Sequence, residues 1–173
     1  RYGDSLFREL CARTEARGGG PYGMEALNVL RIEKGFLTHA EIDGRMTAHD
    51  LGLGRMVAAK DCIGREMMER EGLTANRQQL VGLKSIGTVK QIVQGAVAFD
   101  VGAERVADNI LGHVSSTCYS PTLEQCIALG FVRNGHERLG EQVMAIDLTS
   151  GVDTLCEIVS PVFVDPKGGR LRG

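Results

Sequence analysis

The residues with the clearest potential for chemistry lie in LRIEKGFL, residues 30–37, where three charged side chains precede a glycine. Arg31 and Glu33 are two positions apart, so they point to different sides of a helix and cannot pair with each other. Glu33 follows Val29 by one turn and stands beside Leu30, on the apolar side. A half-buried carboxylate must find hydrogen-bond donors or change its pKa. We expect either a structural anchor to a neighbouring loop or the wall of a polar ligand site.

The histidines and cysteines form no pattern that predicts a metal site or an activated nucleophile. The four histidines are never three or four residues apart, and no Cys-x-x-Cys pair is present. The five cysteines are odd in number and widely spaced, which favours reduced cytosolic thiols over a disulfide framework. Cys118 is close to His113 in the sequence, but nothing local would lower its pKa. We therefore predict no metal ligands and interpret Cys118 as a structural thiol.

The glycine-rich and serine-containing stretches give no support to nucleotide binding or to hydrolysis. The three glycines at 18–20 are not preceded by a strand, and GLGR at 52–55 meets Val57 where a dinucleotide fingerprint has its third glycine. A Gly-x-Ser-x-Gly elbow is also missing. The residues taken alone therefore offer no complete catalytic constellation.

The character of the sequence changes near residue 77. Before that point helical signals dominate: one helix ends at RGGG, residues 17–20, and a second spans 24–34 and ends at Gly35. The Asp43-Gly44 pair predicts a short hairpin. Further short helices are expected in AHDLGLGRMV and CIGREMMEREG.

Beyond residue 77 the pattern of residues is typical of β-strands. Short β-rich runs separated by Gly, Asn, Asp and Pro follow one another at a spacing of roughly 8–12 residues, typical of an antiparallel barrel or sandwich. The runs are 78–86, 88–94, 96–101, 105–117, 126–132, 141–148 and 152–164. The predicted fold class is α+β, with a helix-rich part over residues 1–77 and a small all-β domain over residues 78–173.

Composition and charge exclude several classes of function. The 173 residues are 43% hydrophobic and 24% charged with a net charge of −2, so they show no electrostatic footprint for nucleic acid or an anionic membrane. Aromatic residues make up 5%, without tryptophan, which argues against a stacking platform for single strands. No apolar run approaches the ~20 residues of a membrane helix. We expect no nucleic-acid or membrane partner and a cytoplasmic location. Because the chain starts at Arg1, we expect a piece of a longer protein.

Several linked motifs together resemble the carboxyl-terminal part of the glycine cleavage T-protein (aminomethyltransferase) family. They are YGMEALNVLRIEKGFL, DLGLGRMV, CIGRE, RQQLVGL, GHVSSTCYSPTLEQCIALGFVR and SPVFVDP, in that order. The Glu-Lys-Gly-Phe sequence and the DLGLG segment most resemble those of one branch of this family, the alpha subunits of heterotetrameric sarcosine oxidase. The resemblance covers nearly the whole chain.

The resemblance implies a fold and a reaction. Residues 1–77 would be the helix-rich remainder of a folate-binding domain, and residues 78–173 a small antiparallel β-barrel. Sarcosine would be oxidised at a flavin on another subunit, and its one-carbon unit would pass to tetrahydrofolate. FAD, FMN and NAD would belong to the parent complex and not to this chain. Other sarcosine oxidase subunits would be the partners, and the catalytic aspartate and the pterin-binding glutamate would precede Arg1.

The resemblance also points to two folate-facing residues. Leu27 stands where aminomethyltransferases place a folate-facing arginine, and Phe36 falls where some relatives put an aromatic side chain against the ligand. An apolar rim formed by Leu27 and Phe36 would cover a flat pterin or benzoyl ring. Arg31 and Glu33 would then belong to the framework. SSTCYSPT, residues 115–122, is expected either to line the folate tail or to form a turn of the barrel.

Two other readings remain open on the sequence. The chain could be an assembly module without chemistry of its own, with an exposed apolar face that leads to self-association. It could also belong to an aminomethyltransferase or a dimethylglycine dehydrogenase.

Overall fold

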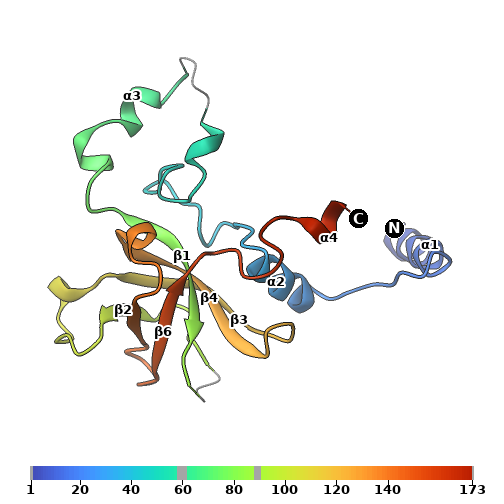
Figure 1. The fold of residues 1–173 in the computed structure, drawn as a ribbon. Helices are drawn as coiled ribbons and strands as arrows, with labels where there is room; N and C mark the ends of the chain where they lie inside the picture. Colours follow the sequence, from blue (N-terminus) through green and yellow to red (C-terminus); the bar gives the residue numbers. More distant parts are fainter. Residues whose placement is uncertain (1, 58–61, 88–90, 173) are drawn as a thin grey trace.

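The computed structural model describes residues 2–57, 62–87 and 91–172, in which helices precede a β-barrel (Figure 1). The α+β fold class is therefore confirmed. The helices are α1 (Gly3–Glu15), α2 (Met24–Glu33), the 3₁₀ turn η1 (Gly54–Met56), α3 (Arg65–Met68), η2 (Glu71–Leu73), η3 (Ala107–Asn109), η4 (Gly135–Glu137) and α4 (Gly169–Arg172). The strands are β1 (Gln78–Ser85), β2 (Val97–Asp100), β3 (Gly112–Ser120), β4 (Gln125–Arg133), β5 (Gln142–Ile146) and β6 (Asp153–Val159). Among these residues, no helix is long and apolar enough to cross a bilayer.

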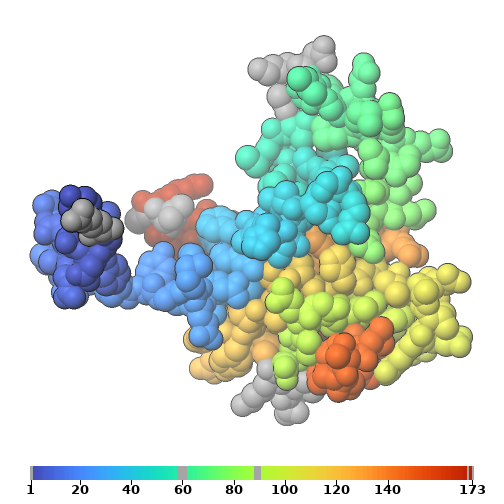
Figure 2. All heavy atoms as spheres, turned by 180° about the vertical axis from the view of Figure 1, so that it is seen from behind, coloured from blue at the N-terminus to red at the C-terminus, as the bar shows by residue number. Residues whose placement is uncertain are grey.

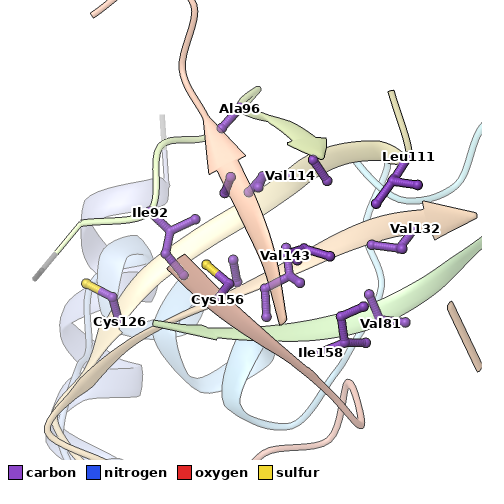
Figure 3. Close-up of a cluster of buried hydrophobic side chains, with 14 residues drawn as sticks. Val81, Ile92, Ala96, Leu111, Val114, Cys126, Val132, Val143, Cys156 and Ile158 are labelled. Atoms are coloured by element: carbon purple, nitrogen blue, oxygen red, sulfur yellow. The ribbon is translucent and has the colours of Figure 1, made fainter. Parts of the chain in front are cut away.

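The strands form a closed barrel in the order β1-β4-β3-β2-β5-β6. Every neighbouring pair is antiparallel, and β1 closes the barrel by pairing with both β4 and β6. Closure leaves no free sheet edge that could pair with another chain. The barrel interior is filled by small and branched side chains from all six strands, together with Ile92 (Figure 3).

Strand β4 is buried on both faces, and this positions α2. Cys126, Ala128 and Val132 belong to the cluster inside the barrel. The alternate residues Ile127, Leu129 and Phe131 belong to an outer cluster that contains Ile32 of α2 and Leu51. Successive side chains of a strand point to opposite faces, so β4 contributes to both clusters. This explains why its sequence is almost continuously apolar.

Helix α1 stands apart from the barrel. It has no buried residue, and an extended segment leads from it to α2 (Figure 1). From behind, its atoms form a separate lobe (Figure 2). Leu6 and Phe7 are each 60% exposed and Leu10 is 54% exposed, so the apolar face of this helix is uncovered.

The predicted hairpin at Asp43-Gly44 is wrong, because the flanking residues form isolated helical turns. The Glu41 carboxylate accepts a hydrogen bond from the backbone nitrogen of Thr38 at 2.9 Å. Asp50 and Thr47 bond each other reciprocally, at 2.8 Å from the Thr47 nitrogen and 3.2 Å from the Asp50 nitrogen. The Thr47–Asp50 pair is a capping box, and both pairs satisfy backbone nitrogens locally and remove donors that a hairpin ladder would need.

The other short predicted helices are partly right. Only η1 forms in residues 48–57, after turns. The segment 62–72 splits into α3 and η2.

Two expectations for the β part are also corrected. Residues 115–122 were expected either to line the folate tail or to form a turn of the barrel, although 115–117 also lay in a predicted β-rich run; residues 115–120 belong to β3, and the turn follows at 121–124. Of the run 88–94, residues 88–90 lie outside the described residues and 91–94 form no strand. The side chain of Ile92 instead packs inside the barrel and is 2% exposed (Figure 3). Its neighbour Gln91 accepts a hydrogen bond from Thr154 Oγ1 at 2.7 Å.

Close packing at the start of β3 predicts a large effect of a single methyl group. A Cβ at Gly112 would lie 1.7 Å from the backbone oxygen of Phe131, whereas a Cβ at Gly44 would meet nothing within 4 Å. We expect Gly112→Ala to lower the free energy of unfolding by at least about 3 kcal/mol, because backbone must move apart. Gly44→Ala should change it by less than about 0.5 kcal/mol. Urea unfolding measures both, and equal stabilities would contradict the strand register.

Candidate functional site

Helix α2 ends at the glycine that the sequence marks. Gly35 has φ +70°, and its nitrogen donates to the carbonyl of Ile32 at 3.0 Å. The nitrogen of Phe36 donates to the carbonyl of Arg31 at 2.8 Å. This pair of bonds is a Schellman motif, which requires the left-handed residue at that point. A Cβ on Gly35 would also lie 2.6 Å from the carbonyl oxygen of Pro161, so the carboxyl-terminal segment passes directly over the end of α2.

Glu33 is an anchor, as one reading of the sequence predicted. Its side chain is 5% exposed and accepts a hydrogen bond from Ser120 Oγ at 2.5 Å. Its backbone carbonyl accepts hydrogen bonds from the nitrogens of Phe163 and Val164, both at 2.9 Å. Glu33 therefore joins α2 to the end of β3 and to the segment after β6.

Arg31 takes part in a second, separate network centred on Glu41. The guanidinium donates to Glu41 Oε2 at 3.2 Å and to Ser116 Oγ at 2.7 Å. The other carboxylate oxygen, Glu41 Oε1, accepts from Ser115 Oγ at 2.9 Å and Ser116 Oγ at 2.5 Å. Glu41 is 1% exposed. Arg31, Glu41 and Ser116 thus connect α2, the turn after it and β3 through charge-assisted hydrogen bonds.

A β-bulge makes this arrangement possible. The register of β3 against β4 shifts between Val114 and Ser116. In a regular strand, consecutive side chains point to opposite faces, but an extra residue at a bulge re-aims one of them. Ser115 and Ser116 can therefore bond the same carboxylate oxygen.

The donors around Glu41 control its ionisation. Burial raises the pKa of the Glu41 carboxyl, but hydrogen bonds from Ser116, Ser115 and Thr38 together outweigh burial and hold it below its ordinary value. Asp50, 2% exposed, is similar: burial raises its pKa, and the Arg77 side chain with Thr47 lowers it further than burial raises it. Both acids are therefore ionised at neutral pH.

A pocket of about 350 Å³ lies at the end of α2. Leu30 and Phe36 supply apolar surface, and Lys34 and Arg170 supply positive charge; Glu33, Thr122, Val164 and Asp165 complete the lining. An apolar wall with a few polar groups is typical of a site for a small organic ligand. We take this pocket as the candidate functional site.

Asp165 organises the side of the pocket opposite the helix end. Its carboxylate accepts hydrogen bonds from Lys34 Nζ at 3.2 Å and from the backbone nitrogens of Gly169 and Arg170 at 2.7 Å and 3.2 Å. These bonds fix the start of α4, the short helix that carries Arg170. Within the described ranges, the guanidinium of Arg170 has no hydrogen-bond partner, so it remains available to a ligand.

The two predicted folate-facing residues are not brought into one pocket by the described part of the chain. Phe36 is 62% exposed and lines the candidate site. Leu27 is 39% exposed and lies on α2 two turns before Lys34, outside the lining. Glu41, by contrast, was not singled out in the sequence. The Thr-x-x-Glu spacing of residues 38–41 is the signal that would have revealed it.

The described residues contain no group of three or more His, Cys, Asp or Glu side chains that could hold a metal ion. The five cysteines are free thiols. Burial, and then the nearby charge of Glu33, raise the pKa of Cys118 to about 11. Its thiol is therefore protonated at neutral pH, in agreement with a structural role.

Comparison with known proteins identifies the family. Residues 78–165 match the glycine cleavage T-protein C-terminal barrel domain, and residues 1–61 match the GCVT N-terminal domain. The chain belongs to the glycine cleavage T-protein family.

Within this family the similar proteins are of two kinds. The chain is 42% identical over 174 residues to sarcosine oxidase subunit alpha of Rhizobium meliloti (strain 1021), covering 99% of this chain and 18% of that protein. It is 28% identical over 165 residues to an aminomethyltransferase of Mycolicibacterium paratuberculosis (strain ATCC BAA-968 / K-10), covering 94% of this chain and 43% of that protein. The chain therefore spans less than a fifth of its sarcosine oxidase relative and less than half of the aminomethyltransferase.

A solved structure supports the same assignment. The crystal structure of the glycine cleavage system aminomethyltransferase T from Bartonella henselae matches with a TM-score of 0.60 and 25% sequence identity. The match covers 82% of this chain and 38% of that chain.

The Glu41 network predicts a large and pH-dependent effect of one substitution. Glu41→Gln keeps the shape but removes the charge, so Arg31 loses its counterion. We expect a loss of about 3 kcal/mol in the free energy of unfolding at pH 7. Because the pKa of Glu41 is depressed in the folded chain, its stabilisation is present above its ordinary pKa of 4.5 and disappears as the pH falls through the folded value. The difference between variant and wild type should therefore shrink below pH 4.5.

The control is Glu9→Gln on α1, which breaks an exposed ion pair with Arg13, 2.6 Å long. It should leave stability unchanged, since such pairs contribute little. Urea unfolding across pH 3–7 is the measurement. If the Glu41→Gln variant unfolds at the same urea concentration as wild type at pH 7, the charge of the Glu41 carboxylate does not stabilise the fold.

Proposed function

We propose that this chain is the carboxyl-terminal part of a sarcosine oxidase alpha subunit. The parent enzyme would oxidatively demethylate sarcosine to glycine and pass the one-carbon unit to tetrahydrofolate. The observation that carries the proposal is the 42% identity to a sarcosine oxidase alpha subunit across 99% of the chain. Aminomethyltransferases, at 28% identity over 94%, are the nearest alternative considered.

Within this proposal, residues 1–77 are the remainder of the folate-binding domain and residues 78–173 the barrel domain. The matches to the N-terminal domain over 1–61 and to the barrel domain over 78–165 support the division. The other sarcosine oxidase subunits are the proposed partners, and the location is cytoplasmic.

Folate would meet this chain at Phe36 and Leu27. The pocket beside Phe36 supports this role, because it combines apolar surface for a flat ring with Lys34 and Arg170 for carboxylates of a folate tail. Leu27 would extend the apolar surface along α2 toward the rest of the cavity.

The reacting groups would lie outside this chain, before Arg1, and FAD, FMN and NAD would be held elsewhere in the parent complex. The support is that Glu33, Glu41 and Asp50, the buried acids described above, are each bound by structural donors. Such carboxylates cannot exchange protons with a substrate without breaking the framework. We expect the isolated chain to be inactive.

Folate titration tests the role of Phe36. In the full-length parent protein, Phe36→Ala should weaken tetrahydrofolate binding by at least about tenfold, because the ring loses an apolar wall. Isothermal titration calorimetry measures the affinity. The matched control is Leu148→Ala, at a residue that is 67% exposed in the loop after β5 and should bind folate like wild type. Equal affinities for Phe36→Ala and Leu148→Ala would place the folate cavity elsewhere. The chain of residues 1–173 alone should bind weakly or not at all.

A second candidate function is assembly without chemistry, and α1 is the observation that favours it. The apolar side chains of Leu6, Phe7 and Leu10 are exposed on one face of a helix that has no buried residue. A face of this kind on a folded chain is typical of an interaction surface. In the isolated chain we expect it to drive self-association.

Sedimentation velocity tests this expectation. The wild-type chain should show a concentration-dependent increase in sedimentation coefficient, and Leu10→Glu should remove it by placing a charge in the apolar face. Ala12→Glu puts the same charge on the opposite side of α1 and should not. A wild-type chain that stays monomeric at all concentrations would exclude self-association through α1.

A further inference from the structure

A second pocket, of about 390 Å³, lies at the start of β1 and shares no residue with the candidate folate site. It is lined by Arg45, Met46, Asn76, Arg77, Gln78 and His113. Two guanidinium groups, two amides and an imidazole therefore face a space bounded by one apolar side chain. Nothing in the proposed folate chemistry uses these residues.

The two arginines are held in place by aspartates, and each keeps a free edge. Arg77 donates from Nη2 to Asp50 at 2.7 Å, and its Nη2 also donates to the carbonyl of Arg45 at 2.5 Å. Arg45 donates to Asp43 at 3.1 Å from Nε and 2.7 Å from Nη2. Over the described residues, Nη1 of both arginines has no hydrogen-bond partner. The Arg77 guanidinium, whose side chain is 21% exposed, is thus pre-oriented, which lowers the entropy cost of binding a further acceptor; the Arg45 side chain is 82% exposed.

His113 completes one wall of the pocket. Its ring stacks on Phe131 with the centroids 5.4 Å apart, and in the described ranges it has no hydrogen-bond partner. Burial, and then the charge of Arg45, lower the pKa of His113, while Asp43 raises it. On the neighbouring strands, Val97 of β2 lies opposite His113, and Arg133 of β4 donates from Nη2 to the carbonyl of Ile110 at 3.0 Å, outside the lining of the pocket.

The two arginines that line the pocket balance in charge with their aspartates. Arg45 and Arg77 carry two positive charges, and Asp43 and Asp50 carry two negative ones. An anion placed here would be attracted by the N–H donors that the two guanidinium groups do not use for their aspartates, and by the imidazole of His113 when it is protonated.

We propose that this pocket binds a small oxyanion, the phosphate or carboxylate group of a small molecule. Guanidinium edges match the geometry of both groups, because two N–H donors can meet two oxygens of one anion. The amides of Asn76 and Gln78 add neutral donors, and the volume is within the range of small-molecule sites.

Calorimetric titration of the chain with inorganic phosphate, and separately with malonate, tests the proposal at constant ionic strength set with sodium chloride. We expect saturable binding of at least one anion at one site. Arg45→Gln should weaken it by about tenfold through loss of a charge-assisted hydrogen bond. Arg8→Gln is the matched control: it removes an arginine that is likewise exposed and paired with an aspartate, at 2.9 Å, and should bind like wild type. The anion that binds more tightly shows whether the pocket prefers a phosphate group or a carboxylate group.

The titration of His113 gives an independent readout by NMR. A bound anion should raise the pKa of His113, so binding should strengthen as the pH falls toward the pKa of His113 in the free protein, which lies below the ordinary histidine value of 6.5. His113→Gln should remove the contribution of the imidazole to the pH dependence and leave only the contribution of the anion's own titration. Absence of saturable binding for both anions, or equal affinities of Arg45→Gln and Arg8→Gln, would overturn the proposal.

Discussion

The carboxylate of Glu41 joins three segments that are far apart in the sequence. It receives hydrogen bonds from Arg31 on α2, from Thr38 at the following turn and from Ser115 and Ser116 on β3. A buried charge is costly unless donors surround it, so these segments can be displaced only at a high energetic cost. The orientation of α2 on the barrel follows from this constraint together with the apolar contacts of Ile32.

The candidate functional site at the end of α2 depends on the separate network of Glu33. Its residues come from the end of α2, the turn after β3 and the segment after β6. Glu33 joins these elements through its side chain and its carbonyl, and Gly35 allows the carboxyl-terminal segment to pass close to the helix. Glu33, Asp165 and Lys34 therefore hold the structure of the pocket, while Phe36 and Arg170 remain on its surface for a ligand.

Buried titratable groups of the described residues are fixed in one protonation state. Glu41 and Asp50 are kept ionised by their donors, and Cys118 is kept protonated by burial and a nearby acid. Groups fixed in this way support a fold and cannot act as proton donors and acceptors near neutral pH.

The sequence by itself determined that helices precede a β-rich part, the end of α2 at Gly35 and the strand status of most β-rich runs, and it offered the anchoring role of Glu33 as one of two alternatives. These features depend on local conformation or on a period of two or 3.6 residues, which neighbouring residues reveal. The tertiary structure alone decided that Ser115 and Ser116 meet Glu41, because a bulge cancels the alternation that the sequence implies. It also decided that Ile92 fills the barrel without belonging to a strand. Contacts between residues such as Arg31 and Ser116, 85 positions apart, arise from the packing of α2 against β3, and no local pattern encodes which residues of two distant elements meet.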